Sequence, residues 1–486
     1  MSSCHPLLML AATIGGNFLI EGAACPRGSR TVYPALMLGA VLSTLVFGFF
    51  LALCGSTVCA WLLSMALVAS VVCGSNIKLS VLDEPLVFSD LFVLKNFLNH
   101  PRFYIFAVPG PVRVVVVLAT VLVLTALGLA VWRAPLARHG WGVGIMLPAL
   151  VALAALPAGR LAPGPDLARD ISRLGLTGCL FVYWRRWRQQ PVAPRPPAPA
   201  LPAQLPELVV VVQCESFADP ATLGLPPDIP VPPLPGLARA RAMASQYGML
   251  EVSGFGAYTN RTEYGVLFGR NAQELGFRQF DPFLTADTES KAALPYLFRQ
   301  AGFETVYIHP YDLSFYNRNT MMREIGFEHL QGRDAFAYTP TATAPYVPDS
   351  DLAHRILDTL HASRKPLFLY AVSIENHGPW HDDTHPVHHY LHHLAHTDAM
   401  IDQLVTGLER SGRTARLVFF GDHRPSIPGM TSAGAGRSTP YAVLDFPPVP
   451  MEQAQKNISA RQIHDIITSP CASERSSLRA KARAAR

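Results

Sequence analysis

The stretch VFFGDH, residues 418–423, decides the fold of the C-terminal part of this chain. Its apolar residues predict a buried strand, and the pair Asp422–His423 follows where that strand ends. A carboxylate and an imidazole at the carboxyl end of one strand can both face a single cation. The pair alone has a simpler alternative, since a capping Asp beside a surface His is a common arrangement.

A second strand of the same design lies much earlier, in LVVVVQCE, residues 208–215. Its continuous β-branched run ends in Glu215. Strands that are apolar throughout are typical of parallel sheets with both faces covered. Two such strands would deliver acidic and imidazole groups to one sheet edge, where α/β proteins place their sites.

The region between residues 207 and 470 alternates between strand-like and helical patterns. Helical patterns occupy residues 294–301 and 398–409, and further strand-like runs occupy residues 305–309, 367–372 and 416–420. This alternation predicts one α/β domain with a mostly parallel central sheet covered on both faces.

The N-terminal third is strongly apolar. Four segments without any charge are each about long enough to cross a bilayer, and they cover residues 33–54, 57–74, 114–132 and 141–159. Residues 6–20 form a fifth span or a signal peptide; no Lys or Arg precedes them and no Ala-x-Ala cleavage site follows, which favours an uncleaved span. We therefore expect a polytopic transmembrane helical domain over residues 1–160, with about five spans and the C-terminal domain on the outer face.

Residues 161–206 are expected to connect the two domains. The stretch YWRRWR, residues 183–188, suits a helix at the lipid headgroup level, with a solvated basic stop as the alternative. Residues 191–206 are proline-rich and predict an extended linker. The basic residues 471–486 have no apolar face and predict a disordered tail.

Composition excludes several classes of function. Of eight cysteines only Cys214 lies in the α/β domain, with Cys471 directly after this domain, and no Cys-x-x-Cys occurs, so neither a disulfide framework nor a thiolate zinc site is expected. The net charge of +5 is modest, and the domain does not combine basic stripes with aromatic residues. We therefore expect no nucleic-acid partner.

The best candidate for a nucleophile lies in GFGAYTNRTEYG, residues 254–265. Glycines flank a polar run that would present a hydroxyl at a helix N-terminus, where free amides stabilise an attacking alkoxide and a transferred anion. The alternative is that Thr259 or Thr262 simply caps the helix.

Five motifs in order along the chain resemble the lipoteichoic acid synthase family. They are QCESF at 213–217, Thr259 ahead of Glu263–Tyr264, HPYDLSFYNR at 309–318, IENH at 374–377 and FGDH at 420–423. LDEPLVFSDL at 82–91 is also similar to the juxtamembrane segment of that family. Its members are membrane phosphoglycerol transferases of the sulfatase and alkaline phosphatase superfamily. The chain departs from the family pattern at Cys214, Tyr258 and Arg261.

The resemblance implies a set of site residues. It implies a divalent cation, Mn²⁺ first with Mg²⁺ or Zn²⁺ as alternatives, held by Glu215, Thr259, Asp422 and His423, with Thr259 also the catalytic nucleophile. It implies that the phosphoglycerol head is bound by His309, Tyr316, Arg318 and His377.

Each of these substrate residues has an alternative. His377 could cap a turn, and Tyr316 with Arg318 could form a surface cation–π pair. The histidines between 381 and 396 could form a metal-buffering tract, while His396 and Asp398 are expected to orient the following helix rather than bind metal.

The resemblance further implies metal-dependent transfer through a phospho-threonine, from a phosphatidylglycerol-like membrane phospholipid to a cell-envelope glycan or polymer. The alternatives are a phosphoethanolamine transferase, a phosphodiesterase or sulfatase-type hydrolase of the same superfamily, and a non-catalytic membrane sensor. The expected location is the bacterial inner membrane, as a multi-pass protein whose catalytic domain faces the periplasm or the cell exterior.

Overall fold

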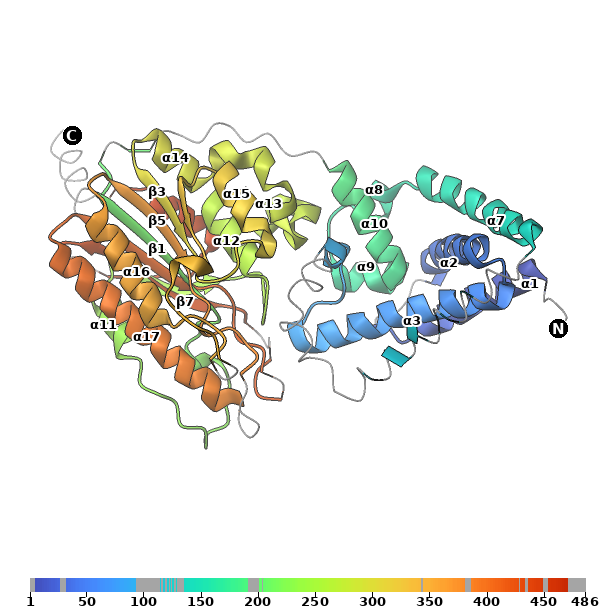
Figure 1. Cartoon of the computed structure of the whole chain (residues 1–486), viewed down its shortest axis with the longest axis horizontal. Helices are drawn as coiled ribbons and strands as arrows, with labels where there is room; N and C mark the ends of the chain where they lie inside the picture. The colour runs from blue at the N-terminus through green and yellow to red at the C-terminus, as the bar shows by residue number, and fades with distance from the viewer. Residues whose placement is uncertain are drawn as a thin grey trace. The chain divides into compact units, whose positions relative to one another are not determined.

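The chain divides into two compact units, Met1–Pro191 and Val192–Arg486 (Figure 1). The computed structural model describes residues 5–26, 32–92, isolated positions between 114 and 128, 135–190, 201–202, 204–341, 344–380, 386–427, 429–432, 436–448 and 453–470. The expected span over residues 114–132 and the proline-rich linker fall largely outside these residues, and the expected tail at 471–486 falls entirely outside them.

The N-terminal unit is helical. Its described helices are α1 (Pro6–Glu21), α2 (Val32–Cys54), α3 (Thr57–Leu82), α7 (Leu136–Ala155), α8 (Ala158–Leu161), α9 (Leu167–Leu174) and α10 (Leu176–Gln189). Within the described residues, α2, α3 and α7 are long and apolar enough to cross a membrane, whereas α1 is apolar but shorter. The apolar segments expected at 33–54, 57–74 and 141–159 are thus confirmed as long apolar helices, and α1 covers the segment expected at 6–20 as a shorter apolar helix.

The aromatic and cationic stretch at 183–188 lies within α10, which packs inside this unit. The Tyr183 hydroxyl is buried and donates to Asp170 at 2.8 Å. The Trp187 ring lies against Phe88, at 5.5 Å between ring centroids. Arg185 donates to the main-chain carbonyl of Ala154 at 3.0 Å. Part of the aromatic and cationic surface is therefore used for helix packing.

The C-terminal unit is built on one nine-stranded sheet in the order β4-β3-β5-β1-β6-β7-β2-β8, with β9 also pairing with β2. The strands are β1 (Leu208–Cys214), β2 (Gln246–Glu251), β3 (Glu304–Ile308), β4 (His329–Gln331), β5 (Leu367–Val372), β6 (Ala415–Gly421), β7 (Thr439–Phe446), β8 (Ala454–Gln455) and β9 (Ile458–Ser459). From β4 to β6 all neighbours are parallel, whereas β7 runs antiparallel to both β6 and β2. The mostly parallel sheet is confirmed.

Helices cover both faces of this sheet (Figure 1). One face packs against α11 (Pro235–Met243), α16 (Asp349–Ala362) and α17 (Pro386–Ser411). The other packs against α12 (Thr259–Phe268), α13 (Ala272–Leu275), α14 (Leu294–Gln300), α15 (Arg318–Glu324) and α18 (Ala460–Ile467). In β1, Val210 and Val212 enter the first core while Val209 and Val211 enter the second. Burial on both faces explains why this strand is apolar throughout.

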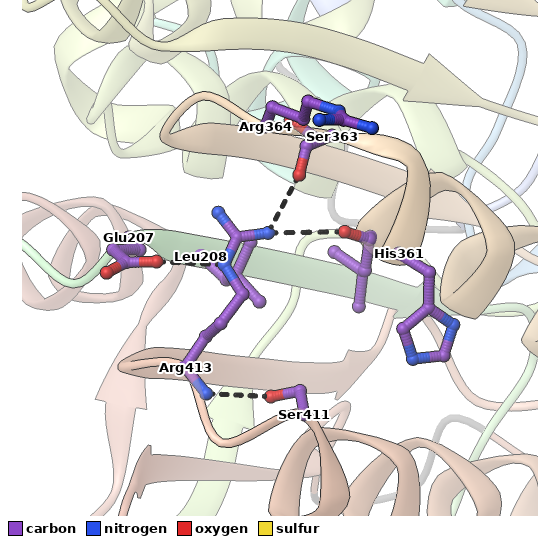
Figure 2. Close-up of a pocket in the computed structure, with 8 residues that line it drawn as sticks. Glu207, Leu208, His361, Ser363, Arg364, Ser411 and Arg413 are labelled. Carbon is purple, nitrogen blue, oxygen red and sulfur yellow. Dashed lines mark hydrogen bonds and ion pairs between the residues drawn. The ribbon is translucent and has the colours of Figure 1, made fainter.

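A pocket of about 280 Å³ lies at the amino end of β1, beside the segments that lead into β5 and β6 (Figure 2). Arg413 crosses it, and its guanidinium donates to Glu207 at 2.8 Å and to the carbonyls of Leu360, Ser363 and Lys365 at 3.1–3.2 Å. These contacts hold the connections at this end of the sheet together. The acidic and imidazole residues singled out in the sequence lie at the opposite, carboxyl end of the strands.

Candidate functional site

Three buried ligand-type side chains meet where β1 and β6 end. These strands pair in parallel with Cys214 opposite Gly421, so Glu215 and Asp422 leave the sheet at the same level. The ligand atoms of Glu215, Asp422 and His423 all lie within 4.8 Å of one another. His423 Nε2 is 3.3 Å from a Glu215 oxygen and 3.5 Å from Asp422 Oδ2. The sheet register therefore assembles the cluster that the two motifs predicted.

The electrostatics of this cluster suit a cation. Burial and then the charge of Glu215 raise the pKa of Asp422 to about 6. Burial opposes protonation of His423, but the charges of Asp422 and Glu215 outweigh it and raise the pKa of His423 above its usual value. Asp422 Oδ1 accepts main-chain N–H groups from Ser216 and His423, whereas the buried Oδ2, 3.5 Å from His423 Nε2, accepts no hydrogen bond from the residues that the structure describes. Two carboxylates, one imidazole and an acceptor to spare fit a divalent cation.

Thr259 is the first residue of α12 and lies beside this cluster. Its hydroxyl is close enough to Asp422 to favour the ionised form of that carboxyl and so to lower its pKa. The Gln213 side chain donates to the Thr259 carbonyl at 3.3 Å, and the Gly256 N–H donates to the Arg424 carbonyl at 2.8 Å. These bonds fix the start of α12 against β1 and against the segment that follows β6.

The residue before Thr259 is strained. Tyr258 has φ of 78° and ψ of 36°, a left-handed conformation that a bulky side chain rarely adopts. Its ring lies under the Arg261 guanidinium, 3.7 Å from ring centroid to Cζ. Backbone strain of this kind is found at functional sites, where surrounding contacts hold it in place. Two of the positions that depart from the family pattern therefore contact each other at the entrance to α12.

Thr262 has a different role. Its side chain is 1% exposed and its hydroxyl donates to the main-chain carbonyl of Asp422 at 2.8 Å. This hydroxyl is used to join α12 to the segment after β6. The structure therefore places Thr259 and Thr262 in different surroundings, whereas from the sequence alone either could have been the residue that caps the helix.

Glu263 is a residue whose importance the sequence did not indicate. It is fully buried, accepts from Arg318 Nη2 at 2.7 Å and accepts from the Tyr307 hydroxyl at 2.8 Å. Arg318 is itself 1% exposed, although its Cζ lies 5.1 Å from the Tyr316 ring centroid. The cation–π contact of the alternative is therefore present, but it does not lie at the surface, because the arginine is buried against the counter-charge of Glu263. The sequence offered one signal of this role, because Glu263 is an acidic residue inside the motif that begins at Thr259 and no role had been assigned to it.

Two histidines among the expected substrate residues are held in one tautomer. His309 Nδ1 lies 3.0 Å from the Val372 carbonyl, and His377 Nδ1 lies 2.5 Å from the Gly378 carbonyl. A carbonyl only accepts, so Nδ1 carries the proton in each neutral ring and Nε2 presents a lone pair. Burial lowers the pKa of His377 to about 4 and that of His309 well below its usual value. Both rings are therefore neutral acceptors near neutral pH.

The expected site residues form one continuous group. His377 lies within electrostatic range of His423 and Asp422, and His309 within that of Arg318 and His377. His309 follows β3 and His377 follows β5, so the group gathers at the carboxyl ends of four neighbouring strands, β3, β5, β1 and β6. This edge is where parallel α/β sheets place their sites.

The expectation for His396 and Asp398 is wrong, because both lie inside α17 rather than before it. Asp398 accepts the N–H groups of Gly236 and Leu237 at 2.8 and 2.7 Å, and so caps the start of α11. His396 Nδ1 lies 2.7 Å from Glu375. The helical pattern of α17 extends further toward the N-terminus than its apolar residues indicated.

Residues 207–445 match the sulfatase family. The C-terminal unit is a sulfatase-like α/β domain, and it is preceded by apolar helices, three of which within the described residues are candidate membrane spans. This agrees with the superfamily to which the resemblance pointed.

Among individual proteins, the chain is similar to the capsular polysaccharide biosynthesis protein RkpI of Rhizobium meliloti (strain 1021). The two are 33% identical over 244 residues, which cover 49% of this chain and 45% of that protein, so the chain matches less than half of its relative's length. Two solved structures resemble the fold. The Streptococcus pyogenes phosphoglycerol transferase GacH, in complex with sn-glycerol-1-phosphate, is 17% identical with a TM-score of 0.44, covering 54% of this chain and 75% of that one. The lipoteichoic acid synthase LtaP from Listeria monocytogenes is 16% identical with a TM-score of 0.43, covering 55% and 71%.

Proposed function

We propose that this chain moves a phosphoglycerol-type group from a membrane phospholipid to a cell-envelope glycan or polymer, through a covalent intermediate on Thr259. The observation that carries the proposal is the position of Thr259, at the start of α12 and beside the buried carboxyl of Asp422. A hydroxyl with a helix N-terminus around it and ligand-type groups next to it is equipped to attack phosphorus.

The proposed metal ligands are Glu215, Thr259, Asp422 and His423, with Mn²⁺ as the first choice of cation and Mg²⁺ or Zn²⁺ as alternatives. Such a cation, when bound, lowers the pKa of a hydroxyl and offsets charge on phosphoryl oxygens. The Thr259 oxygen forms a bond to phosphorus, and the bond from phosphorus to the diacylglycerol oxygen breaks. An acceptor hydroxyl then attacks the same phosphorus and releases Thr259.

The proposed headgroup site favours hydroxyl groups. His309 and His377 are neutral and offer Nε2 lone pairs, to which the hydroxyls of a glycerol can donate. Arg318 keeps a positive charge beside them. An ammonium headgroup would lie next to this like charge, because the Glu263 carboxylate is already occupied by Arg318 and Tyr307. These contacts support glycerol over ethanolamine as the transferred alcohol.

The three apolar helices support a location in the bacterial cytoplasmic membrane. We propose that the sulfatase-like domain faces outward, where both a phospholipid headgroup and an envelope glycan are accessible.

The test uses the full-length protein in vesicles that contain phosphatidylglycerol or phosphatidylethanolamine, each labelled in its headgroup, with Mn²⁺ present. We expect diacylglycerol release from phosphatidylglycerol, and a labelled peptide that contains Thr259 when no acceptor is added. Label from phosphatidylethanolamine on that peptide would instead indicate the phosphoethanolamine transferase. Rapid release of free glycerol phosphate without any acceptor would indicate a hydrolase.

A further inference from the structure

A run of aromatic rings lies beside the residues proposed to bind the headgroup. The ring centroids of Phe315 and Tyr311 are 6.2 Å apart, and those of Tyr311 and Tyr346 are 6.3 Å apart. The Tyr346 ring in turn lies 5.7 Å from the His377 ring, and the Tyr311 ring lies 6.1 Å from the His309 ring. Tyr311, Phe315 and Tyr346 therefore form one aromatic cluster that borders both histidines of the proposed headgroup site.

The aromatic cluster lies on the solvent side of buried polar groups. Tyr311, Phe315 and Tyr346 are each partly exposed, whereas His309 and Arg318 are 3% and 1% exposed. Aromatic side chains around a few convergent polar groups are the usual lining of a ligand site. The cluster is therefore placed where a second substrate can meet a group that is held beneath it.

Contacts from other segments fix the two tyrosines. The Tyr311 carbonyl accepts the main-chain N–H of Arg333 at 3.0 Å. The Tyr346 hydroxyl donates to the Gly378 carbonyl at 3.1 Å and lies within electrostatic range of Glu215. Tyr346 therefore links Tyr311 to the ligand cluster to which Glu215 belongs. Rings that are held in place before a ligand arrives lose little freedom when it binds.

The loop that carries Phe315 has an unusual conformation. Tyr316 and Asn317 have φ of 56° and 54°, so two successive residues other than glycine are left-handed. The Asn319 N–H donates to the Leu313 carbonyl at 2.8 Å and closes the loop around them. Strain of this kind persists at functional sites, where the surrounding structure holds it. The Phe315 ring lies 4.5 Å from the Tyr316 ring, so the aromatic cluster is continuous with the proposed headgroup site.

The four residues proposed for the headgroup do not include Tyr311, Phe315 or Tyr346. A glycerol has three carbons, which are too few to cover these further rings. A pyranose ring carries C–H groups on its faces and hydroxyls around its edge, so its faces pack on aromatic rings while its edge forms hydrogen bonds to tyrosine hydroxyls. An acyl chain has no polar edge to match the two tyrosines.

We propose that Tyr311, Phe315 and Tyr346 form an acceptor subsite that binds a pyranose ring of a glycan. The inference rests on the proposed function and adds to it the chemical class of the acceptor. A sugar on this cluster lies next to His377 and close to the ligand cluster, on the side from which an acceptor hydroxyl approaches the phosphorus on Thr259. The subsite binds and orients the acceptor and adds no step to the transfer.

The experiment uses the full-length protein in vesicles of headgroup-labelled phosphatidylglycerol with Mn²⁺, in which Thr259 first takes up label without an acceptor. Glycerol, or an oligosaccharide of glucose, galactose or N-acetylglucosamine, is then added. The rate at which label moves from Thr259 to the acceptor is measured per labelled protein and against acceptor concentration. We expect one or more of the oligosaccharides to remove the label about tenfold faster than glycerol at equal concentration.

Paired variants test whether the rings bind the sugar. Tyr311→Leu and Tyr346→Leu keep an apolar side chain without an aromatic face, and each should raise the oligosaccharide concentration for half-maximal removal about tenfold. Tyr311→Phe and Tyr346→Phe keep the face and should change it by less than about threefold. Tyr346→Phe also loses the bond to Gly378, so it separates stacking from that bond. Tyr296→Leu alters a partly exposed ring on α14, outside the cluster, and should match the parent.

Three outcomes overturn the inference while the proposed function stands. They are removal of the label by glycerol at least as fast as by every oligosaccharide, leucine variants that match the parent protein, and phenylalanine variants that lose as much as the leucine variants. The last would assign the effect to the hydroxyls and not to the rings. Absence of label on Thr259 in the parent protein would instead refute the proposed function, on which the inference rests.

Discussion

The Thr262 side chain donates a 2.8 Å hydrogen bond to the main-chain carbonyl of Asp422. This bond joins the helix that begins with Thr259 to the residues that follow β6. Thr259 and Thr262 are three positions apart on α12, and only Thr259 has a hydroxyl beside the Asp422 carboxyl. Of two similar hydroxyls on one helix, that of Thr262 is thus used for structure, and that of Thr259 is the one proposed for chemistry.

Thr259→Ala should abolish turnover and leave the fold intact, because it removes the proposed nucleophile from the start of α12. Thr262→Ala should retain much of the activity and lower stability by about 1 kcal/mol, the usual cost of a lost hydrogen bond. Diacylglycerol release and thermal unfolding of both variants provide the measurement. Equal, modest losses of activity in the two variants would contradict the assignment.

Asp422→Asn and His423→Ala should each remove the cation proposed to bind at Glu215, Asp422 and His423. Loss of a ligand weakens binding, and with it the stabilisation that binding gives to the folded state. Metal content and the rise in melting temperature on adding Mn²⁺ measure this. If either variant keeps its bound metal and its rise in melting temperature on adding Mn²⁺, the ligand set is wrong.

Glu263→Gln should destabilise the domain by about 3–5 kcal/mol, because it leaves the Arg318 charge buried without its partner. The double variant Glu263→Gln/Arg318→Met removes both charges and should recover part of that loss in melting temperature. Neither variant should transfer phosphoglycerol at the parent rate, since Arg318 is proposed to face the headgroup. A single variant as stable as the parent would show that the pair is not coupled.

Two arginines far from the proposed site allow a comparison of buried and exposed ion pairs. Arg416 is fully buried, pairs with Asp445 at 2.7 Å and donates to one carbonyl at the end of α18 and to one after it. Arg413 is partly exposed and pairs with an exposed Glu207. Arg416→Met should cost about 3–5 kcal/mol and Arg413→Met much less, with the turnover of folded protein unchanged. Similar melting temperatures for the two variants would refute this ranking.

Tethering should matter for the lipid substrate. The domain from about residue 207 onward should cleave a soluble phosphoglycerol analogue, yet be much slower on lipid in bilayers, because it lacks the effective concentration that membrane helices provide. The ratio of the two activities is compared between full-length and truncated protein. A ratio that truncation leaves unchanged would mean that the N-terminal unit does not deliver the donor.

The sequence predicted the parallel half of the sheet because β1, β3, β5 and β6 each contain a continuous apolar run, and such runs carry a strong local signal. It did not predict the antiparallel strand β7, whose run from Thr439 to Phe446 has no feature that encodes direction. The direction of pairing depends on contacts far apart in the sequence, which periodicity does not report.

For the site, the motifs at the strand ends brought Glu215, Asp422 and His423 together as expected. The partnership of Glu263 with Arg318 was not predictable, because the two residues are 55 positions apart and neither carries a local signal of burial. The same holds for Glu375 and His396, which meet only after β5 and α17 have packed. Local patterns located the strand ends, and tertiary packing determined the partners.

The register that sets Cys214 opposite Gly421 also imposes an order on biosynthesis. Glu215 and Thr259 are translated early, but Asp422 and His423 are added only near the end of the domain. They directly follow β6, which pairs with β1, made long before, and with β7, made afterwards. A nascent or prematurely terminated chain that stops before β6 contains the threonine without the complete ligand cluster.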